Sequence, residues 1–212
     1  ETTVYDYEVL RDRLRQLAFL NKGIRIVFND ERQEEEDKKS HTFYFEGGLK
    51  QYIEYLNKNR TVIHPDIIYC EGHEDGIECE IAVQYNDGYN PNVYTFCNNI
   101  NTGEGGTHEE GFRLALNRVI NKYARENGFL KEKDDYLTSD DCREGITAVI
   151  SVKHPDPQYE GQTKTKLGNT EVRKIVSDIF GTQLERFLLE NPDEAKIIIE
   201  KASLASQARM AA

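Results

Sequence analysis

The chain has 212 residues, of which 38% are hydrophobic and 31% charged, and its formal net charge is −11. This composition is typical of a soluble folded protein, and no segment approaches the ~18 consecutive apolar residues that a membrane span requires. A simple nucleic-acid-binding protein is usually basic, so any contact with DNA would have to be local.

The N-terminal part of the chain predicts a helix followed by a hairpin. Leucines at helical spacing indicate a helix over residues 6–21, for which Asp6 is a suitable N-cap. Residues 24–28 and 41–45 are predicted to be strands. The charged run 30–40 between them has no apolar face, so we expect a solvated hairpin tip without chemistry of its own.

A second amphipathic helix is predicted after Gly47-Gly48, and residues 58–65 are expected to form a boundary segment. Period-two alternation over residues 77–85 then indicates a strand with one buried face. Asp87-Gly88 is a turn signal, and residues 92–99 are predicted to be the partner strand.

The remaining elements are mostly helical. Residues 108–126 and 170–189 are predicted to be helices, residues 145–154 a strand of nearly continuous apolar character, and Pro192 the start of a last helix. Strands followed by helices with long crossovers predict an α+β fold.

The four cysteines, at positions 70, 79, 97 and 142, show no CxxC spacing, so no metal site is predicted. Without an apolar signal segment near the N-terminus, they are expected to be reduced thiols in a cytoplasmic protein. Cys79 lies on the apolar register of its strand and is expected in the core. Glu1 in place of Met, and a helical pattern that reaches Ala212, predict that the sequence is a piece of a longer protein.

Two polar segments have both a chemical and a structural interpretation. The Gly-rich loop 101–108 could bind a phosphate through its backbone amides, but it lacks GxxxxGK[ST] and contains Glu104, which favours a turn leading into the next helix. Adjacent carboxylates in segment 138–145 could bind a metal. A short helical turn in which Asp141 and Arg143 cap or form ion pairs is the favoured interpretation.

Two further features could meet an anion. Arg113 lies at the edge of the apolar face of helix 108–126, from which it could point into a cleft. The loop 155–167 connects a buried strand to a helix, and its lysine and glutamine side chains could bind a phosphate. On the residues alone, solvated basic groups are the favoured interpretation of both features. The loop presents Gln162, Lys164 and Lys166.

Eight short segments stand in collinear order over essentially the whole chain. They are 14–23 (LRQLAFLNKG), 45–48 (FEGG), 54–57 (EYLN), 98–100 (NNI), 105–108 (GGTH) with 111–113 (GFR), 143–145 (REG), 162–164 (QTK) and 189–192 (LENP). Together these segments resemble the DNA gyrase B family of type IIA topoisomerase ATPase subunits. The set is specific because its order and spacing match, although no single segment is decisive. The sister subunit of topoisomerase IV shares most of the segments.

The resemblance implies that residues 1–46 are the C-terminal part of a GHKL ATP-binding domain. It implies that residues 47–212 are a transducer domain, of a type also seen in a ribosomal protein and in small-molecule kinases, with a C-terminal linking helix. Gln162 and Lys164 would then touch the γ-phosphate of ATP, and Arg113 would line the cavity through which DNA passes. The function implied is coupling of ATP binding and hydrolysis to DNA strand passage and negative supercoiling.

The resemblance also implies ATP and Mg²⁺ as cofactors of the full subunit, and the gyrase A subunit, DNA and a second B subunit as partners in the A2B2 holoenzyme. The family's catalytic glutamate, magnesium-binding asparagine and adenine-binding aspartate would precede Glu1. We therefore expect this chain alone to be a monomer without bound cofactor, without ATPase activity and without a membrane partner.

Two alternatives remain open. The chain could belong to the B subunit of topoisomerase IV, although FEGG at residues 45–48 favours gyrase. It could also be a stand-alone nucleic-acid or protein interaction module, but an acidic chain without aromatic residues on a basic face argues against RNA binding.

Overall fold

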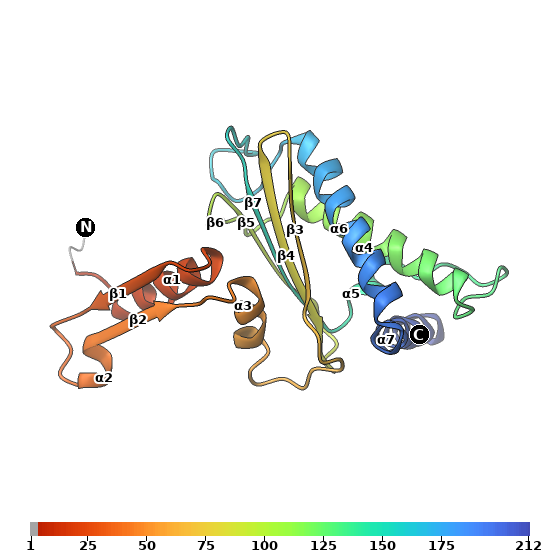
Figure 1. Cartoon of the computed structure of the whole chain (residues 1–212), viewed down its shortest axis with the longest axis horizontal. Coiled ribbons are helices and arrows are strands. Elements are labelled where there is room, and N and C mark those ends of the chain that lie inside the picture. The colour runs from red at the N-terminus through yellow and green to blue at the C-terminus, as the bar shows by residue number, and fades with distance from the viewer. Residues whose placement is uncertain (1–3) are drawn as a thin grey trace. The chain divides into compact units, whose positions relative to one another are not determined.

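The computed structural model describes residues 4–212, which form two compact units (Figure 1). The first unit ends at Tyr55, and the second runs from Leu56 to Ala212. None of the helices within the described residues is both long and apolar enough to cross a membrane.

The first unit begins with α1 (Tyr7–Leu20), capped as predicted by the carboxylate of Asp6, which accepts hydrogen bonds from two backbone amides of the first turn. β1 (Arg25–Asn29) and β2 (Ser40–Tyr44) form the expected antiparallel hairpin. Its charged tip contains one turn of helix, α2 (Glu36–Lys39), without buried residues.

The last helix of this part is α3 (Leu49–Leu56), which contacts α1 through aromatic side chains. Phe19 stacks on Tyr52 with ring centroids 4.8 Å apart, and on Phe45 at 3.8 Å. The unit boundary therefore lies after Tyr55, whereas the domain boundary expected from the resemblance lies after Glu46, before α3.

The second unit contains a five-stranded sheet in the order β3-β4-β7-β5-β6. All neighbouring strands are antiparallel except β5 and β7, which run parallel across a crossover that contains α4. The strands are β3 (Ile68–Glu74), β4 (Ile77–Tyr85), β5 (Asn92–Cys97), β6 (Ile100–Asn101) and β7 (Ile146–Lys153).

The pairing predicted for residues 92–99 is wrong. β4 pairs with β3 and β7, and β5 pairs with β7 and β6. The hairpin of β4 is closed by Asp75-Gly76, whose positive φ angles of 53° and 77° suit a tight two-residue turn. Asp87-Gly88 closes no hairpin, because the amide of Asp87 donates to the carbonyl of Thr61.

Helices α4 (Thr107–Glu126) and α6 (Thr170–Glu190) cover one face of this sheet, and α7 (Pro192–Ala211) lies at their far end next to the short α5 (Ser139–Arg143) (Figure 1). The predicted apolar face of α4 is buried in this core. Gly111 allows α4 and α6 to approach closely, since a Cβ there would lie 2.3 Å from the carbonyl oxygen of Arg173. The buried residues of the predicted face are Ala115, Leu116, Val119, Ile120 and Tyr123.

Candidate functional site

The loop between β7 and α6 is tied together at its base. Tyr159 and Leu167 form an antiparallel bridge across the loop, and Leu167 also pairs with Gly106 at the start of α4. The amide of Glu160 donates to the carbonyl of Lys166 at 2.9 Å, which closes the stem above this bridge. Backbone hydrogen bonds need no particular side chain, so the local sequence contains no pattern that predicts this stem.

The Gly-rich loop 101–108 supports the stem, and this confirms that it is a turn leading into a helix. The amides of Glu104 and Thr107 donate to the carbonyls of Thr165 and Leu167, so they are not available to an anion. The carboxylate of Glu104 accepts from the hydroxyl of Thr165 at 2.6 Å. Gly106 has φ +133°, and a Cβ on it would lie 2.3 Å from the carbonyl oxygen of Leu167.

The tip of the loop, by contrast, is exposed. Among residues 4–212, Gln162 and Lys164 have no hydrogen bond or ion pair, whereas Lys166 pairs with Glu160 at 3.0 Å. The hydrogen bond to Glu160 raises the pKa of Lys166. Of the three polar side chains that the sequence places on this loop, Gln162 and Lys164 are therefore the two that are free to meet an anion.

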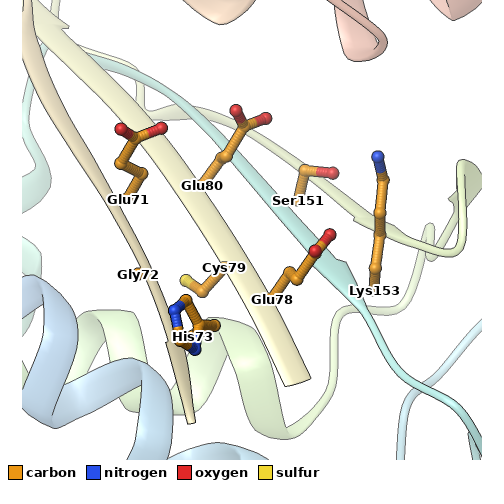
Figure 2. Close-up of a pocket in the computed structure, with 8 residues that line it drawn as sticks. All are labelled: Glu71, Gly72, His73, Glu78, Cys79, Glu80, Ser151 and Lys153. Carbon is orange, nitrogen blue, oxygen red and sulfur yellow. The ribbon is translucent and has the colours of Figure 1, made fainter. Parts of the chain in front are cut away.

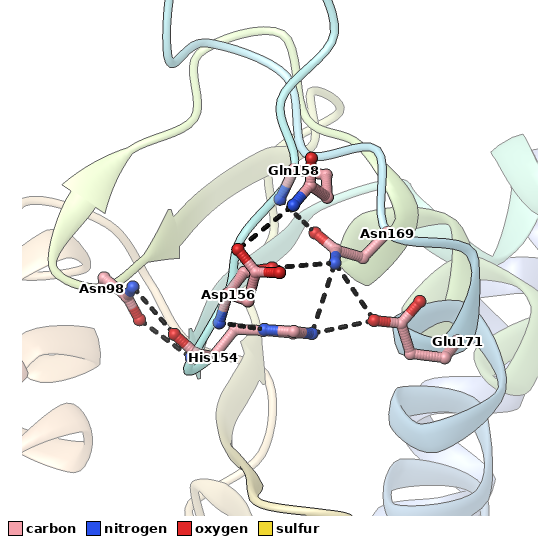
Figure 3. Close-up of polar contacts among 6 residues, drawn as sticks. All are labelled: Asn98, His154, Asp156, Gln158, Asn169 and Glu171. Atoms are coloured by element: carbon pink, nitrogen blue, oxygen red, sulfur yellow. Dashed lines mark hydrogen bonds and ion pairs between the residues drawn. The ribbon is translucent and has the colours of Figure 1, made fainter.

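A polar network fastens both ends of the loop (Figure 3). The ring nitrogen Nδ1 of His154 accepts from the amide of Asp156 at 2.9 Å, so its proton lies on Nε2 and is donated to Glu171 at 2.8 Å. Asn98, in the turn between β5 and β6, exchanges two hydrogen bonds with the backbone of His154. Asn169, where the loop enters α6, accepts through its side-chain oxygen from the amide of Gln158 near the start of the loop, at 2.6 Å.

Sequence reasoning missed this network, although one signal was present. Asn98-Asn99 joins two short strands, and both residues have positive φ angles, 51° and 65°. Such a turn is typical of two-residue hairpins, and it aims the Asn98 side chain at the loop (Figure 3). The role of His154 depends on contacts between distant segments and has no local pattern.

Arg113 lies half-buried on α4 and lines a cavity of about 350 Å³. The cavity contains neither Gln162 nor Lys164, so the candidate site residues form two separate places on the second unit. Across the cavity, Arg173 on α6 donates from Nε and Nη2 to Glu110 at 2.8 and 2.6 Å. The lining residues are Glu110, Arg113, Leu114, Asn117, Ser139 and Arg173.

Another cavity, of about 460 Å³, lies against β3, β4 and β7 (Figure 2). Glu71, Glu78 and Glu80 supply negative charge there, and Lys153 one positive charge. The hydroxyl of Tyr69 lies within hydrogen-bond distance of the carboxylates of Glu71 and Glu80, at 2.9 and 2.8 Å. Within the described residues, no group of three or more histidine, cysteine or acidic side chains has an arrangement that could hold a metal ion.

The structural interpretations of the cysteines and of segment 138–145 are confirmed. All four cysteines are free and buried, and burial raises the pKa of Cys79 to about 12. The hydroxyl of Thr138 and the carboxylate of Asp141 form a capping box at α5. Asp141 also accepts from Arg209 near the end of α7, and Arg143 pairs with Asp140.

Comparison with known proteins gives the family. The family model of DNA gyrase B matches residues 48–212. The chain belongs to the DNA gyrase B family. The whole chain is 54% identical to the B subunit of DNA gyrase from Enterococcus faecalis, of which it spans about a third (33%).

Solved structures agree with this assignment and confirm the α+β fold. The crystal structure of the 43K ATPase domain of Thermus thermophilus gyrase B in complex with an aminocoumarin matches with a TM-score of 0.86 and 37% identity, over 98% of this chain and 55% of that one. The topoisomerase IV ATP-binding domain of Francisella tularensis, in complex with a small-molecule inhibitor, matches with a TM-score of 0.81 and 29% identity, over 99% of this chain and 56% of that one.

Proposed function

We propose that residues 47–212 are the transducer domain of a DNA gyrase B subunit and that residues 1–46 end its GHKL ATP-binding domain. The chain would couple ATP binding and hydrolysis to DNA strand passage and negative supercoiling. The observation that carries this proposal is the loop between β7 and α6, whose tied stem presents the side chains of Gln162 and Lys164 without a partner among residues 4–212. The similarity to the T. thermophilus ATPase domain supports it.

In this proposal the loop senses the γ-phosphate of ATP. Lys164 supplies a positive charge and Gln162 an amide donor, and a charge-assisted hydrogen bond of this kind contributes ~1.5–3 kcal/mol in proteins. Hydrolysis and release of phosphate remove the contact. A ligand shifts a conformational equilibrium only by its differential affinity for the two states, and this contact would exist in one state alone.

ATP and Mg²⁺ would be held mainly by residues of the full subunit outside this chain. The exposed lysine and glutamine fit a phosphate group, but nothing else on the loop could hold the base or sugar of a nucleotide. We therefore expect this chain alone to hydrolyse no ATP. Mg²⁺, when bound, would neutralise charge on the phosphates.

The second unit would then move as a rigid body about the segment around residues 46–65, and α7 would pass the motion on. Arg113 would contact DNA in the passage cavity. The partners of the full subunit would be the gyrase A subunit, a second B subunit and DNA, in the cytoplasm.

Lys164→Ala in the full-length protein tests the sensing role. ATP turnover should fall roughly ten- to a hundredfold, because a charge-assisted contact to the phosphate is lost. Lys166→Ala is the matched control, since Lys166 lies on the same loop but pairs with Glu160. The variants would be compared by steady-state ATP hydrolysis and by circular dichroism. Equal turnover in both variants would contradict the proposal.

A further inference from the structure

The cavity between α4, α5 and α6, called here the α4–α6 notch, brings two arginines together from distant parts of the chain. Arg113 lies on α4 and Arg173 on α6, and both line the notch. They line the same cavity because the backbones of α4 and α6 approach closely at Gly111, where a Cβ would lie 2.3 Å from the carbonyl oxygen of Arg173. The proposed function uses Arg113 alone and leaves the rest of the notch unassigned.

The guanidinium groups have donors to spare. Within residues 4–212, Arg113 has no hydrogen bond or ion pair. Arg173 donates from Nε and Nη2 to a single oxygen of Glu110, at 2.8 and 2.6 Å, which leaves its Nη1 edge unused. A guanidinium group carries five N–H donors in a fork that suits oxygen pairs of carboxylates and phosphates.

Two neutral side chains add donors to the same cavity. The side-chain oxygen of Asn117 accepts from Asn121 at 2.9 Å and from the thiol of Cys142 at 3.7 Å, and this fixes the amide so that its NH₂ group remains available. The hydroxyl of Ser139, at the start of α5, makes no hydrogen bond with the described part of the chain. The notch therefore presents four donor groups and one carboxylate.

We propose that the α4–α6 notch binds one phosphodiester group of a nucleic-acid backbone. Arg113 and Arg173 supply the charge, and Asn117 and Ser139 supply directional hydrogen bonds. This inference rests on the proposed function, in which Arg113 meets DNA, and it adds Arg173 and the two neutral donors to the site.

The charge of the notch fits this ligand. Two arginines and Glu110 leave one net positive charge, which equals in size the single negative charge of a phosphodiester. The rest of the chain repels polyanions, because the net charge of the whole molecule is −11. A contact with DNA must therefore be local, and phosphate contacts of this kind position a duplex without reading its sequence.

Glu110 has a distinct role in this arrangement. Its carboxylate holds Arg173 at the notch, but it also competes with the phosphate for that guanidinium. Removal of Arg173 and removal of the Glu110 charge both break the same ion pair. They should nevertheless change DNA binding in opposite directions, and a merely structural ion pair would not show this.

The experiment measures binding of a fluorescently labelled short DNA duplex to this chain at low salt. Arg173→Gln should weaken binding roughly tenfold and reduce the slope of log K against log salt by about 0.9, the value for one lost phosphate contact. Glu110→Gln should strengthen binding. Lys174→Gln is the matched control, because Lys174 is the next residue, is exposed and pairs with Asp178 outside the notch.

Several outcomes would overturn the proposal. Equal losses in Arg173→Gln and Lys174→Gln would show general charge attraction, and equal losses in Arg173→Gln and Glu110→Gln would show a structural pair. If Arg113→Gln alone weakens binding, the proposed DNA contact of Arg113 stands, and the proposal that the α4–α6 notch binds a phosphodiester is contradicted. If none of the variants weakens binding, both fail.

A second experiment distinguishes a phosphate of the nucleic-acid backbone from free inorganic phosphate. Inorganic phosphate and the duplex are titrated separately into the isotope-labelled chain, and the arginine side-chain N–H signals are followed by NMR. We expect the Arg113 and Arg173 signals to move with duplex at concentrations where inorganic phosphate leaves them unchanged. Movement with inorganic phosphate only would overturn the assignment to a nucleic-acid backbone. Circular dichroism of each variant confirms that the fold is kept.

Discussion

The loop between β7 and α6 and the helix α7 are held in opposite ways. The loop is tied at its base by backbone bonds, and its tip carries Gln162 and Lys164 without a partner among the described residues. Helix α7 is fixed at both ends by buried carboxylates, Glu194 in its first turn and Asp141 opposite its last turn. In the proposed function the loop would sense a ligand and α7 would pass on the motion, and an exposed donor on a tied stem and a helix with fixed ends suit these two tasks.

The contact at the start of α7 joins three segments. One carboxylate oxygen of Glu194 accepts from the amide of Asp66 at 2.9 Å and from Nδ1 of His64 at 3.0 Å. The other ring nitrogen of His64 accepts from the amide of Tyr85 at 3.0 Å. α7 is thereby hydrogen-bonded to the segment that precedes β3 and, through His64, linked to β4.

Gly106→Ala should produce the largest effect, because it attacks the stem of the loop. The new Cβ would lie 2.3 and 2.5 Å from the backbone oxygen and nitrogen of Leu167, at a φ of +133° that alanine rarely adopts. We expect a loss of roughly 3–5 kcal/mol in the free energy of unfolding, measured by urea denaturation.

Gly103→Ala is the control for this change. Gly103 lies with Gly106 in the Gly-rich loop 101–108, and a Cβ on Gly103 would have Oδ1 of Asn101, 3.9 Å away, as its nearest atom. Its effect should stay within about 0.5 kcal/mol. If the two variants were equally stable, the close approach of Gly106 to Leu167 would not hold the loop.

We expect the stability of the fold to depend on pH through His64, which is buried at the start of α7. Burial lowers its pKa from 6.5 to about 4, and protonation would also replace the acceptor that the amide of Tyr85 uses. The neutral histidine therefore stabilises the fold fully above pH 6.5, and this stability is lost as the pH falls towards 4. The loss amounts to at most about 3 kcal/mol, since one pKa unit corresponds to about 1.4 kcal/mol.

Urea denaturation of the wild type and of His64→Gln between neutral pH and pH 4 would measure this loss. Glutamine keeps a donor and an acceptor but does not titrate, and Glu194 is present in both proteins. The wild type should lose more stability on acidification than the variant. Parallel curves would show that His64 is not the group responsible.

Much of this fold could be predicted from the sequence, because most elements carry a local pattern. The amphipathic α4, the capped α1 and Pro192 at the start of α7 all lie where predicted. The strand order could not be predicted, since β7 enters the sheet between β4 and β5 from a position far along the chain. β3 was missed although Asp75-Gly76 is the same Asp-Gly hairpin signal as Asp87-Gly88.

At the candidate sites, too, some residues could be predicted from the sequence and others could not. The family resemblance singled out Gln162, Lys164 and Arg113 for roles that stay predictions, and the structure adds where these side chains lie. The supports of these residues could not be predicted, because they come from distant segments. Gly106 meets Leu167 through the backbone, and Arg173 lines the same cavity as Arg113 because α4 and α6 pack closely.

Glu194→Ala should destabilise the second unit by about 2 kcal/mol, because it leaves the buried Nδ1–H of His64 without an acceptor and removes the acceptor of the Asp66 amide. Glu200→Ala on the same helix is the control. Glu200 pairs with Lys196 at 3.9 Å, and both side chains are more than half exposed, so the loss should be below about 0.5 kcal/mol. Thermal unfolding of both variants would decide, and similar losses would mean that the start of α7 is not fixed by its carboxylate.

Asp141→Ala should have the smallest effect, about 1 kcal/mol, because the capping contact at α5 and the pairing with Arg209 are lost but water can reach Arg209. Asp140→Ala is the control, since Asp140 is exposed and pairs only with Arg143 among the described residues. Although burial opposes it, the hydrogen bond from Arg209 helps to lower the pKa of Asp141, so the carboxylate is charged at neutral pH.

Amide hydrogen exchange locates the consequence of Asp141→Ala. The last turns of α7 should exchange faster, while the stem of the loop, at residues 159 and 167, should exchange as in the wild type, because its hydrogen bonds involve no atom of α7. Faster exchange in both regions would show that the loop and the helix open together. The stiffness of the loop would then depend on the fixed ends of α7, and the two regions would form one cooperative element.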